Sequence, residues 1–233
     1  MAFYYSPKIV TDGLVLYLDA ANPNSYVSGS TTWRDISRGG NNGTLINGPT
    51  YSPLNGGSIV FDGTNDYVDF GVNSRINAVN TYTFSFVISS PSINSNYRLM
   101  FTRALNYTTG VSDIEIYGGN GGIQLVHNRN NGGTISAAVI TALPNSVIGV
   151  LDVVYDSSIS SWLCYYNSIL RNTFTSIAPP LTTNTYMSNI GTFFAGSSYL
   201  IGNLYSFKLY NRPLRSSEIL QNYNATKSRF GLT

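Results

Sequence analysis

Hydrophobic and polar residues alternate with a period of two along much of this chain, the pattern that a half-buried β-strand produces. The segment TYTFSFVI at 81–88 has an aromatic or aliphatic residue at every second position, with threonine and serine between them. In residues 151–155 the pattern places Leu151, Val153 and Tyr155 on one face. Both segments predict antiparallel strands with one face toward a core and the other toward solvent.

The segment YSFKLY at 205–210 predicts a strand with Tyr205, Phe207 and Leu209 facing inward and Ser206 and Lys208 facing outward. Many short strands of this kind, without long helical periods, favour a β-sandwich over an alternating βαβ fold. Further strands are expected at 14–19, 58–62, 66–70, 98–102, 112–117, 122–127, 162–166 and 199–203.

Asn-Gly pairs punctuate the chain, and both residues tolerate the positive φ angles that tight turns require. They occur at 42–43, 47–48, 55–56, 120–121 and 131–132. The segment YGGNGG at 117–122 lies between two alternating runs and predicts a hairpin loop. The Asn- and Gly-rich stretch 38–57 is interpreted as a long loop inside the domain.

One helix is expected near the end of the chain, over residues 216–223. Ile219, Leu220 and Tyr223 fall on one helical face, and an N-cap serine after Pro213 fits a helix start. Because no internal repeat or linker is present, we predict a single domain over 13–233, preceded by an N-terminal arm at 1–12.

Composition and charge exclude several function classes. Only 10% of the residues are charged and the net charge is +2 without a basic run, so we expect no nucleic-acid binding. No apolar run reaches the ~18–20 residues of a membrane span, so no membrane insertion is expected. The opening MAFYYSPKIV does not have the pattern of a secretory signal peptide. The single Cys164 is expected to be a buried, inert thiol.

Acidic residues cluster in the segment FDGTNDYVDF, where Asp62, Asn65, Asp66 and Asp69 would offer oxygen atoms to a calcium ion. A β-turn is the preferred interpretation, because Gly63 can adopt the difficult torsion and the side-chain oxygens can accept bonds from nearby amides. In a strand that starts at Asp66, Asp66 and Asp69 would point to opposite faces. We therefore expect a hairpin turn here and no metal ion.

Four segments follow one another in a characteristic order: GLVLYLDA at 13–20, WRDIS at 33–37 with NGTL at 42–45, IVFDGTNDYV at 59–68, and GNLYSFKLYNRPL at 202–214 before the helix with Glu218 and Ile219. Together they resemble the laminin-G-like branch of the concanavalin A-like lectin/glucanase superfamily. The resemblance implies an all-β, antiparallel jelly-roll sandwich with one short C-terminal helix. It departs from the family at Arg215, which replaces the Ser or Thr of a helix capping box.

Relatives with this fold include glucanases, whose catalytic strand reads Glu-x-Asp-x-x-Glu. Here Asp113 and Glu115 share a face but no third carboxylate follows, so both are interpreted as solvated acids on an outer face. His127, the sole histidine, is expected in a surface or turn position without a nucleophile nearby. One histidine and one cysteine cannot form a closed zinc shell. We expect no catalytic residue, no cofactor and no metal site.

The two tryptophans, Trp33 and Trp162, are candidate sugar-stacking groups. Trp33 lies in a segment of the family likeness and is expected to anchor the core. Trp162 begins an alternating strand in which it shares a face with Cys164 and Tyr166. Stacking of either ring on a sugar is the less favoured alternative.

The flanks are similar to those of structural proteins of tailed, cyanophage-like bacteriophages: SPKIVTDGL at 6–14 with ANP at 21–23, and QNYNATK at 221–227 with RFG at 229–231. The likeness implies a non-enzymatic virion protein, a capsid decoration or fibre subunit made in the host cytoplasm. It would contact other virion proteins, and a homo-oligomer is compatible with such a role. Phe3, Tyr4 and Tyr5 of the arm would dock on a neighbour or, alternatively, cover the edge of the sandwich. The alternative is a carbohydrate-binding module that engages host-surface glycans through loops at one end of the sandwich.

Overall fold

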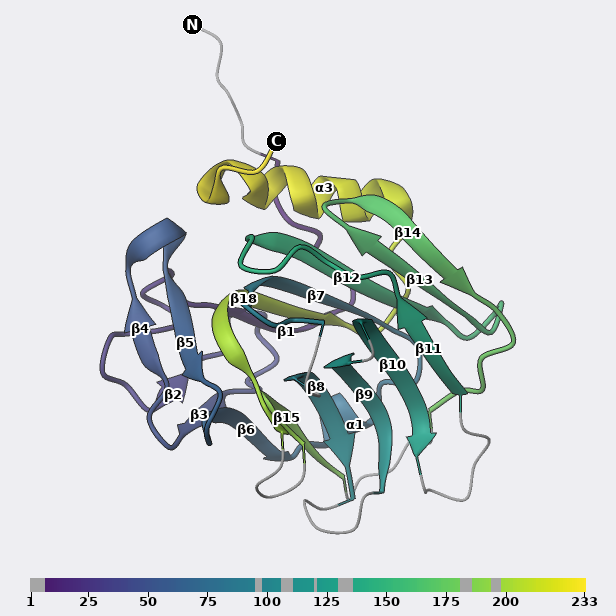
Figure 1. The fold of residues 1–233 in the computed structure, drawn as a ribbon, viewed down its shortest axis with the longest axis horizontal. Coiled ribbons are helices and arrows are strands. Elements are labelled where there is room, and N and C mark those ends of the chain that lie inside the picture. The colour runs from purple at the N-terminus through teal and green to yellow at the C-terminus, as the bar shows by residue number, and fades with distance from the viewer. Residues whose placement is uncertain are drawn as a thin grey trace, which may run out of the picture.

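Two antiparallel eight-stranded sheets lie face to face in the computed structural model, which describes residues 7–94, 98–105, 111–119, 121–129, 136–180, 186–193 and 198–233 (Figure 1). Sheet A has the strand order β14 (Ile169–Phe174), β13 (Ser161–Tyr166), β12 (Gly149–Asp156), β7 (Tyr82–Ser89), β18 (Ile201–Tyr210), β5 (Ser58–Asp62) and β4 (Thr50–Ser52), and β1 (Leu14–Asp19) also pairs with β18. Sheet B has the order β11 (Ser136–Ile140), β10 (Gly122–Arg129), β9 (Ser112–Gly119), β8 (Arg98–Ala104), β15 (Met187–Ile190), β6 (Tyr67–Val72), β3 (Gly43–Ile46) and β2 (Thr32–Trp33).

The remaining elements are short. A two-stranded ribbon joins β16 (Thr192–Phe193) and β17 (Ser198–Tyr199). Among the described residues, the helices are α1 (Ser74–Asn77), α3 (Ser216–Thr226) and the 3₁₀ turns η1 (Leu54–Gly56) and η2 (Lys227–Phe230). The predicted antiparallel sandwich with one short C-terminal helix is confirmed, and the described part of the chain contains no helix long and apolar enough to cross a membrane.

Several strand predictions need correction. The stretch 38–57 is not a long loop, because it contains β3 and β4, strands of only four and three residues that show little alternation. The expected strand at 199–203 is divided between β17 and β18. Strands β11, β14 and β15 had no clear period-two signal and were not predicted. The hairpin at 117–122 is confirmed, since β9 and β10 pair with Gly119 opposite Gly122.

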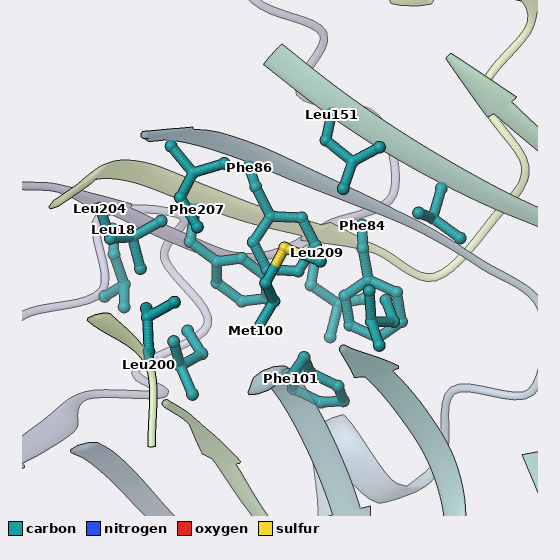
Figure 2. Packing of buried hydrophobic residues seen from close by; sticks show 14 of the residues in the cluster. Leu18, Phe84, Phe86, Met100, Phe101, Leu151, Leu200, Leu204, Phe207 and Leu209 are labelled. Carbon is teal, nitrogen blue, oxygen red and sulfur yellow. The ribbon is translucent and has the colours of Figure 1, made fainter. Parts of the chain in front are cut away.

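Aromatic side chains from both sheets interlock in the core. Figure 2 shows Phe84, Phe86 and Phe207 of sheet A facing Met100 and Phe101 of sheet B. The ring centroids of Phe84 and Phe101 are 4.5 Å apart, and those of Phe86 and Phe207 are 5.0 Å apart. Each ring is at most 1% exposed, and full burial of such a side chain contributes roughly 1.5–3 kcal/mol. The inward faces predicted for 81–88 and 151–155 are confirmed.

The outer face of sheet A is also buried, which the alternation did not predict. Helix α3 lies over this face in Figure 1, and Tyr223 of α3 and Phe230 of η2 pack with Val87 and Tyr205. Tyr205 was expected to face the core, but the register shifts between Leu204 and Ser206. This β-bulge turns Tyr205 toward the helix while Leu204 enters the core.

Helix α3 begins without the serine cap that was expected. Arg215 occupies the N-cap position and Ser216 is the first helical residue. The carboxylate of Glu218 accepts the backbone N–H of Arg215 at 2.9 Å and two bonds from the Arg212 guanidinium at 2.7 and 2.9 Å. The Arg212 bonds lower the pKa of Glu218 to about 2. Ile219 is buried as predicted, but Leu220 is 48% exposed.

The residues before β1 are held against α3. The Val10 N–H donates to Asn222 Oδ1 at 2.8 Å, and the Tyr210 hydroxyl donates to the Val10 carbonyl at 3.1 Å. Phe3, Tyr4 and Tyr5 lie outside the described residues. The division into an arm at 1–12 and a domain at 13–233 therefore stays a prediction.

Two charged residues are buried on the outer face of sheet A. Cross-strand register aligns Asp152 of β12 with Ser85 of β7, and Ser85 with Lys208 of β18. Lys208, expected to be solvated, is 1% exposed, and its ammonium lies 5.0 Å from the ring centroid of Tyr17. Burial raises the pKa of Asp152 to about 6 and lowers that of Lys208 to about 8.

The Asp152 carboxyl should make stability depend on pH. Because the pKa of Asp152 is raised in the folded state, its contribution to the free energy of unfolding is fully present below pH 4. This contribution is lost as the pH rises through 6. We expect Asp152→Asn to match the wild type at pH 4 and to exceed its free energy of unfolding by roughly 1–3 kcal/mol at pH 7.5. Urea unfolding at both pH values measures the difference.

Asp156→Asn on the same strand is the matched control, because Asp156 lies in a surface turn where it accepts bonds from Ser158. It should show no gain between the two pH values. An Asp152→Asn effect of equal size at pH 4 and pH 7.5 would contradict the assignment.

Candidate functional site

A row of polar side chains crosses the outer face of sheet B. The register aligns Asp69 of β6 with Asn189 of β15, Asn189 with Thr102 of β8, and Thr102 with Glu115 of β9. Successive residues of a strand point to opposite faces of the sheet. The residues next to the row in the sequence point into the core, so the side chains of the row point to the outer face. Those core neighbours are Val68, Phe70, Phe101, Ile114, Ile116 and Ile190.

These four residues, which we call the sheet B row, are distant in sequence but lie on consecutive strands of one sheet. Strands in a sheet are about 4.8 Å apart, so the row spans roughly 14 Å. Thr102, Glu115 and Asn189 are buried, whereas Asp69 is half-buried. The row therefore runs from a partly accessible end at β6 into a buried centre.

The Glu115 end of the row is a hydrogen-bonded network. Arg129 of β10 donates from Nε to both Glu115 oxygens, at 2.9 and 3.0 Å, and Ser112 also donates to this carboxylate. Arg129 Nη2 donates to the Tyr117 hydroxyl at 3.0 Å, which donates to Gln124 Oε1 at 2.8 Å. Burial raises the pKa of Glu115, and the charge of Arg129 opposes that rise. The guanidinium thus compensates a buried carboxylate.

Two side-chain amides on this face lack partners among the residues that the structure describes. Asn189 is fully buried, yet neither its Nδ2 nor its Oδ1 makes a hydrogen bond. Gln124 uses Oε1 but leaves its buried Nε2 without an acceptor. A buried polar group without a partner costs about 1–3 kcal/mol. Such groups call for an explanation, and a ligand that supplies the missing bonds is one.

Two tyrosines flank the accessible end of the row. Tyr67 of β6 and Tyr199 of β17 are both half-buried. Burial is the main cause that raises the pKa of Tyr67, and the nearby Asp69 and Tyr199 raise it further. The site therefore combines the amides and carboxylates of sheet B with aromatic rings and hydroxyls from β6 and from the β16–β17 ribbon.

The acidic segment after β5 forms a turn, as predicted, but not a hairpin. Asp62 Oδ1 accepts the Thr64 N–H at 2.7 Å, and Asp66 Oδ2 accepts the Asp62 N–H at 3.0 Å. Strand β5 belongs to sheet A and β6 to sheet B, so the turn crosses between the sheets. Asp69 lies on the outer face, and the described residues contain no group of three or more His, Cys, Asp or Glu placed to hold a metal ion.

The interpretation of Asp113 and Glu115 as solvated acids is wrong, because both side chains are fully buried. Arg103 Nε donates to Asp113 at 2.9 Å, and its Nη1 donates to the carbonyls of Ile76 and Val79 at 2.9 and 2.8 Å. Arg103 thereby ties the segment after α1 to the end of the sandwich. Each carboxylate is held in its own ion pair with an arginine.

The placement of His127 at the surface is also wrong. It is fully buried, and its Nδ1 donates to the Ala178 carbonyl at 2.8 Å. Its Nε2 must then accept the Tyr82 hydroxyl, 2.6 Å away, which accepts the Trp162 Nε1–H at 3.0 Å. Burial lowers the pKa of His127 to about 3, so the ring is a neutral structural link.

The predicted burial of Trp33 and Cys164 is confirmed, and Trp162 is equally buried. Neither indole ring is exposed for stacking on a sugar. Burial raises the pKa of the Cys164 thiol, which fits an inert core residue.

A hollow of about 690 Å³ opens beside the start of α3. Val154, Leu163 and Tyr165 of sheet A contribute apolar surface. The guanidinium of Arg212 on its rim is bound to Glu218, and also contacts Asp12 at 2.8 Å. Because its principal charges neutralise one another, this hollow is a less suitable site for a polar ligand than the sheet B row.

The sequence did not predict that most of the residues of the row would belong to a site. Asn189 lies on a four-residue strand without an alternating pattern, and Thr102 and Arg129 carry no motif. For Glu115 the sequence predicts only a solvated acid that shares a face with Asp113. The signal that unites these residues is cross-strand register, which a local pattern does not contain.

Comparisons with known proteins agree with this architecture. The sequence matches the family described as Laminin_G_3, concanavalin A-like lectin/glucanases superfamily, over residues 62–220. No curated protein matches the chain.

Solved structures share the fold at low sequence identity. Domain 4 of AbnA, an extracellular arabinanase from Geobacillus stearothermophilus in complex with arabinotriose, has a TM-score of 0.68 at 13% identity, covering 90% of this chain and 98% of that domain. The botulinum neurotoxin serotype D binding domain has a TM-score of 0.66 at 14% identity, covering 92% of this chain and 52% of that one. Trypanosoma rangeli sialidase in complex with the inhibitor DANA has a TM-score of 0.65 at 16% identity, covering 94% of this chain and 35% of the sialidase.

Removal of Arg129 should reveal how much free energy of unfolding is lost when the buried Glu115 carboxylate has no counter-charge. We expect Arg129→Ala to lower the free energy of unfolding by roughly 2–4 kcal/mol, because it leaves that charge buried without a counter-charge. The double variant Arg129→Ala/Glu115→Gln should regain most of the loss. Urea unfolding of both variants and of Glu115→Gln alone measures the coupling, and additive single effects would contradict it.

Proposed function

The chain belongs to the concanavalin A-like lectin/glucanases superfamily, and from that premise we propose that it is a carbohydrate-binding module that holds a glycan against the outer face of sheet B without cleaving it. The observation that carries this proposal is the Asn189 side chain, which is fully buried on that face with neither amide atom hydrogen-bonded among the described residues. A folded protein retains such a group at a cost that a ligand would offset.

The chemistry of the row suits sugar hydroxyls. A hydroxyl both donates and accepts, and the Asn189 amide offers a donor and an acceptor at one point. Gln124 Nε2 adds a further donor. The half-buried rings of Tyr67 and Tyr199 offer apolar surface beside these polar groups. A few fixed polar groups beside aromatic surface are typical of small-ligand sites.

The structural neighbours support a glycan ligand by analogy only. One neighbour is an arabinanase domain with bound arabinotriose, and another is a sialidase with bound inhibitor. Their identity to this chain is 13% and 16%, so what they share with it is the fold. The assignment of a glycan to this chain therefore depends on the residues of the row.

Binding without hydrolysis follows from the state of the acids. Retaining glycoside hydrolysis uses two carboxyl groups about 5 Å apart, one of them a protonated acid and the other a free nucleophile. Asp113 is held by Arg103 and Glu115 by Arg129, each at 2.9 Å. Neither carboxylate is presented as a free nucleophile, so we assign the site to recognition.

Removal of the Asn189 amide should separate binding from stability. We expect Asn189→Ala to weaken glycan binding about tenfold or more, because two hydrogen bonds to the ligand are lost. Its effect on the free energy of unfolding should be small, because removal of the unbonded buried amide offsets the cavity that the truncation leaves. A glycan array identifies the ligand, and calorimetric titration compares the variants.

Ser188→Ala is the matched control, because Ser188 is the preceding residue of β15 and its buried hydroxyl also lacks a partner among the described residues. Successive strand residues point to opposite faces, so this change should leave glycan affinity unaltered. Equal affinity of Asn189→Ala and the wild type for every bound glycan would overturn the assignment of this face.

We further propose that the module is carried on a virion, as a head-surface decoration or fibre subunit in contact with other virion proteins. The similarity of residues 6–14 and 221–227 to phage structural proteins supports this proposal. Mass spectrometry of purified particles should find the chain, with hundreds of copies for a head-surface protein. Deletion of residues 2–8 should abolish its incorporation, and normal occupancy would contradict a docking role for the arm.

A further inference from the structure

A hollow of about 480 Å³, which we call the β1 hollow, opens beside strand β1. Residues from two segments, 9–17 and 36–38, line it. It shares no lining residue with the hollow beside α3, and none of its residues belongs to the sheet B row. Its volume lies within the roughly 300–1,000 Å³ that small-molecule sites occupy. The β1 hollow is therefore a candidate binding site that is independent of the proposed glycan site.

A β-bulge turns two apolar side chains of β1 toward the same side. The register with β18 shifts between Leu14 and Leu16, so Leu14 leaves the core face that Leu16 and Leu18 occupy. Leu14 packs instead with the cluster that contains Tyr210 and residues of α3. Tyr17 follows Leu16 in the strand and therefore also points away from the core. Both side chains are half-buried and line the hollow, so each offers it apolar surface.

The second wall is a loop that is bonded along the edge of β1 opposite β18. The Ile36 N–H donates to the Tyr17 carbonyl at 2.9 Å, and the Tyr17 N–H donates to Asp35 Oδ1 at 2.9 Å. The Ser37 hydroxyl donates to the Val15 carbonyl at 2.9 Å. These bonds hold the half-buried side chain of Ile36 at the hollow. Because they involve the backbone of β1, the hollow is preformed.

Arg38 brings a positive charge to the hollow. Of the described residues that line it, Arg38 alone is charged. Its exposed guanidinium makes no hydrogen bond or ion pair with any residue that the structure describes, whereas Arg103, Arg129 and Arg212 are each paired with an acid. The φ angle of Arg38 is +78°, a conformation that residues other than glycine retain mainly at functional sites.

The acidic groups closest in sequence do not neutralise Arg38. The Asp35 carboxylate accepts three backbone N–H bonds of 2.8–2.9 Å from β1 and its own loop. Asp12 is paired with Arg212 at 2.8 Å, on the side of the other hollow. The guanidinium of Arg38 is therefore available to an anion from solution. A planar guanidinium binds a carboxylate through two parallel hydrogen bonds.

We propose that the β1 hollow binds a small organic carboxylate with an aliphatic or aromatic body. The apolar body contacts Ile9, Leu14 and Ile36, which are all half-buried at the hollow. The carboxylate pairs with Arg38. A few polar groups that fix one end of a ligand, beside apolar walls, are the usual arrangement of a small-molecule site. The site lies on sheet A and does not depend on whether sheet B binds a glycan.

A matched acid and amide test this proposal on the full chain at pH 7.5. The probes are 3-phenylpropionate and 3-phenylpropionamide, with octanoate as an aliphatic acid. Titration followed by NMR should shift the methyl resonances of Ile36, and the acid should bind at least about fivefold more tightly than the amide. Arg38→Gln should abolish that preference, and Ile36→Ala should weaken the binding of both probes. Arg34→Gln is the control, because Arg34 is an exposed arginine of the same region that does not line the hollow.

The other outcomes would overturn the proposal. Absence of any Ile36 shift with the acids up to about 10 mM would show that the hollow takes no such ligand. Equal affinity for acid and amide, or a preference that survives Arg38→Gln, would remove the role of Arg38. NMR contacts from Phe3, Tyr4 or Tyr5 to Ile36 would show that the hollow is filled by the arm. Urea unfolding of Arg38→Gln should match the wild type, because its guanidinium has no partner among the described residues.

Discussion

Interlocking of aromatic and aliphatic side chains between the two sheets is the constraint on which the rest of the structure depends. Phe84 and Phe207 of sheet A pack against Phe101 of sheet B, with ring centroids 4.5 and 6.0 Å apart, and Phe86 packs beside Phe207. Because successive strand residues alternate between faces except at a bulge, fixing one face toward this core also fixes which residues lie on the outer faces. The polar row on sheet B is thus a consequence of how the core packs.

The two outer faces are used differently. That of sheet A is closed by α3 and the residues around it, so that Tyr205 and Tyr223 form a second apolar layer. That of sheet B carries polar groups instead, including the ion pair of Glu115 with Arg129. Closure of one face allows the sandwich to gain stability there, and the opposite face is the one to which we assign glycan recognition. The same division appears in the chain, since the helix follows the last long strand directly.

Buried polar groups in this protein fall into two kinds. Some are satisfied internally, as His127 is by Tyr82 and the Ala178 carbonyl. These groups secure one arrangement of the strands, because each can bond fully only in that arrangement. Asn189 is of the other kind, since its burial carries a cost that no bond within the described chain offsets. That contrast is the physical basis for assigning recognition to sheet B.

The sequence by itself determined the period-two strands, the Asn-Gly turns, the inward placement of Trp33 and the existence of a helix near residue 216, because each depends on neighbours within a few residues. Tertiary structure alone decided that β5 and β6 lie in different sheets and that Glu115 is buried beside an arginine. It also brought Asn189 into line with residues 102 and 115. Strand order and register arise from packing of the whole chain, so no local pattern of residues encodes which distant side chains become neighbours.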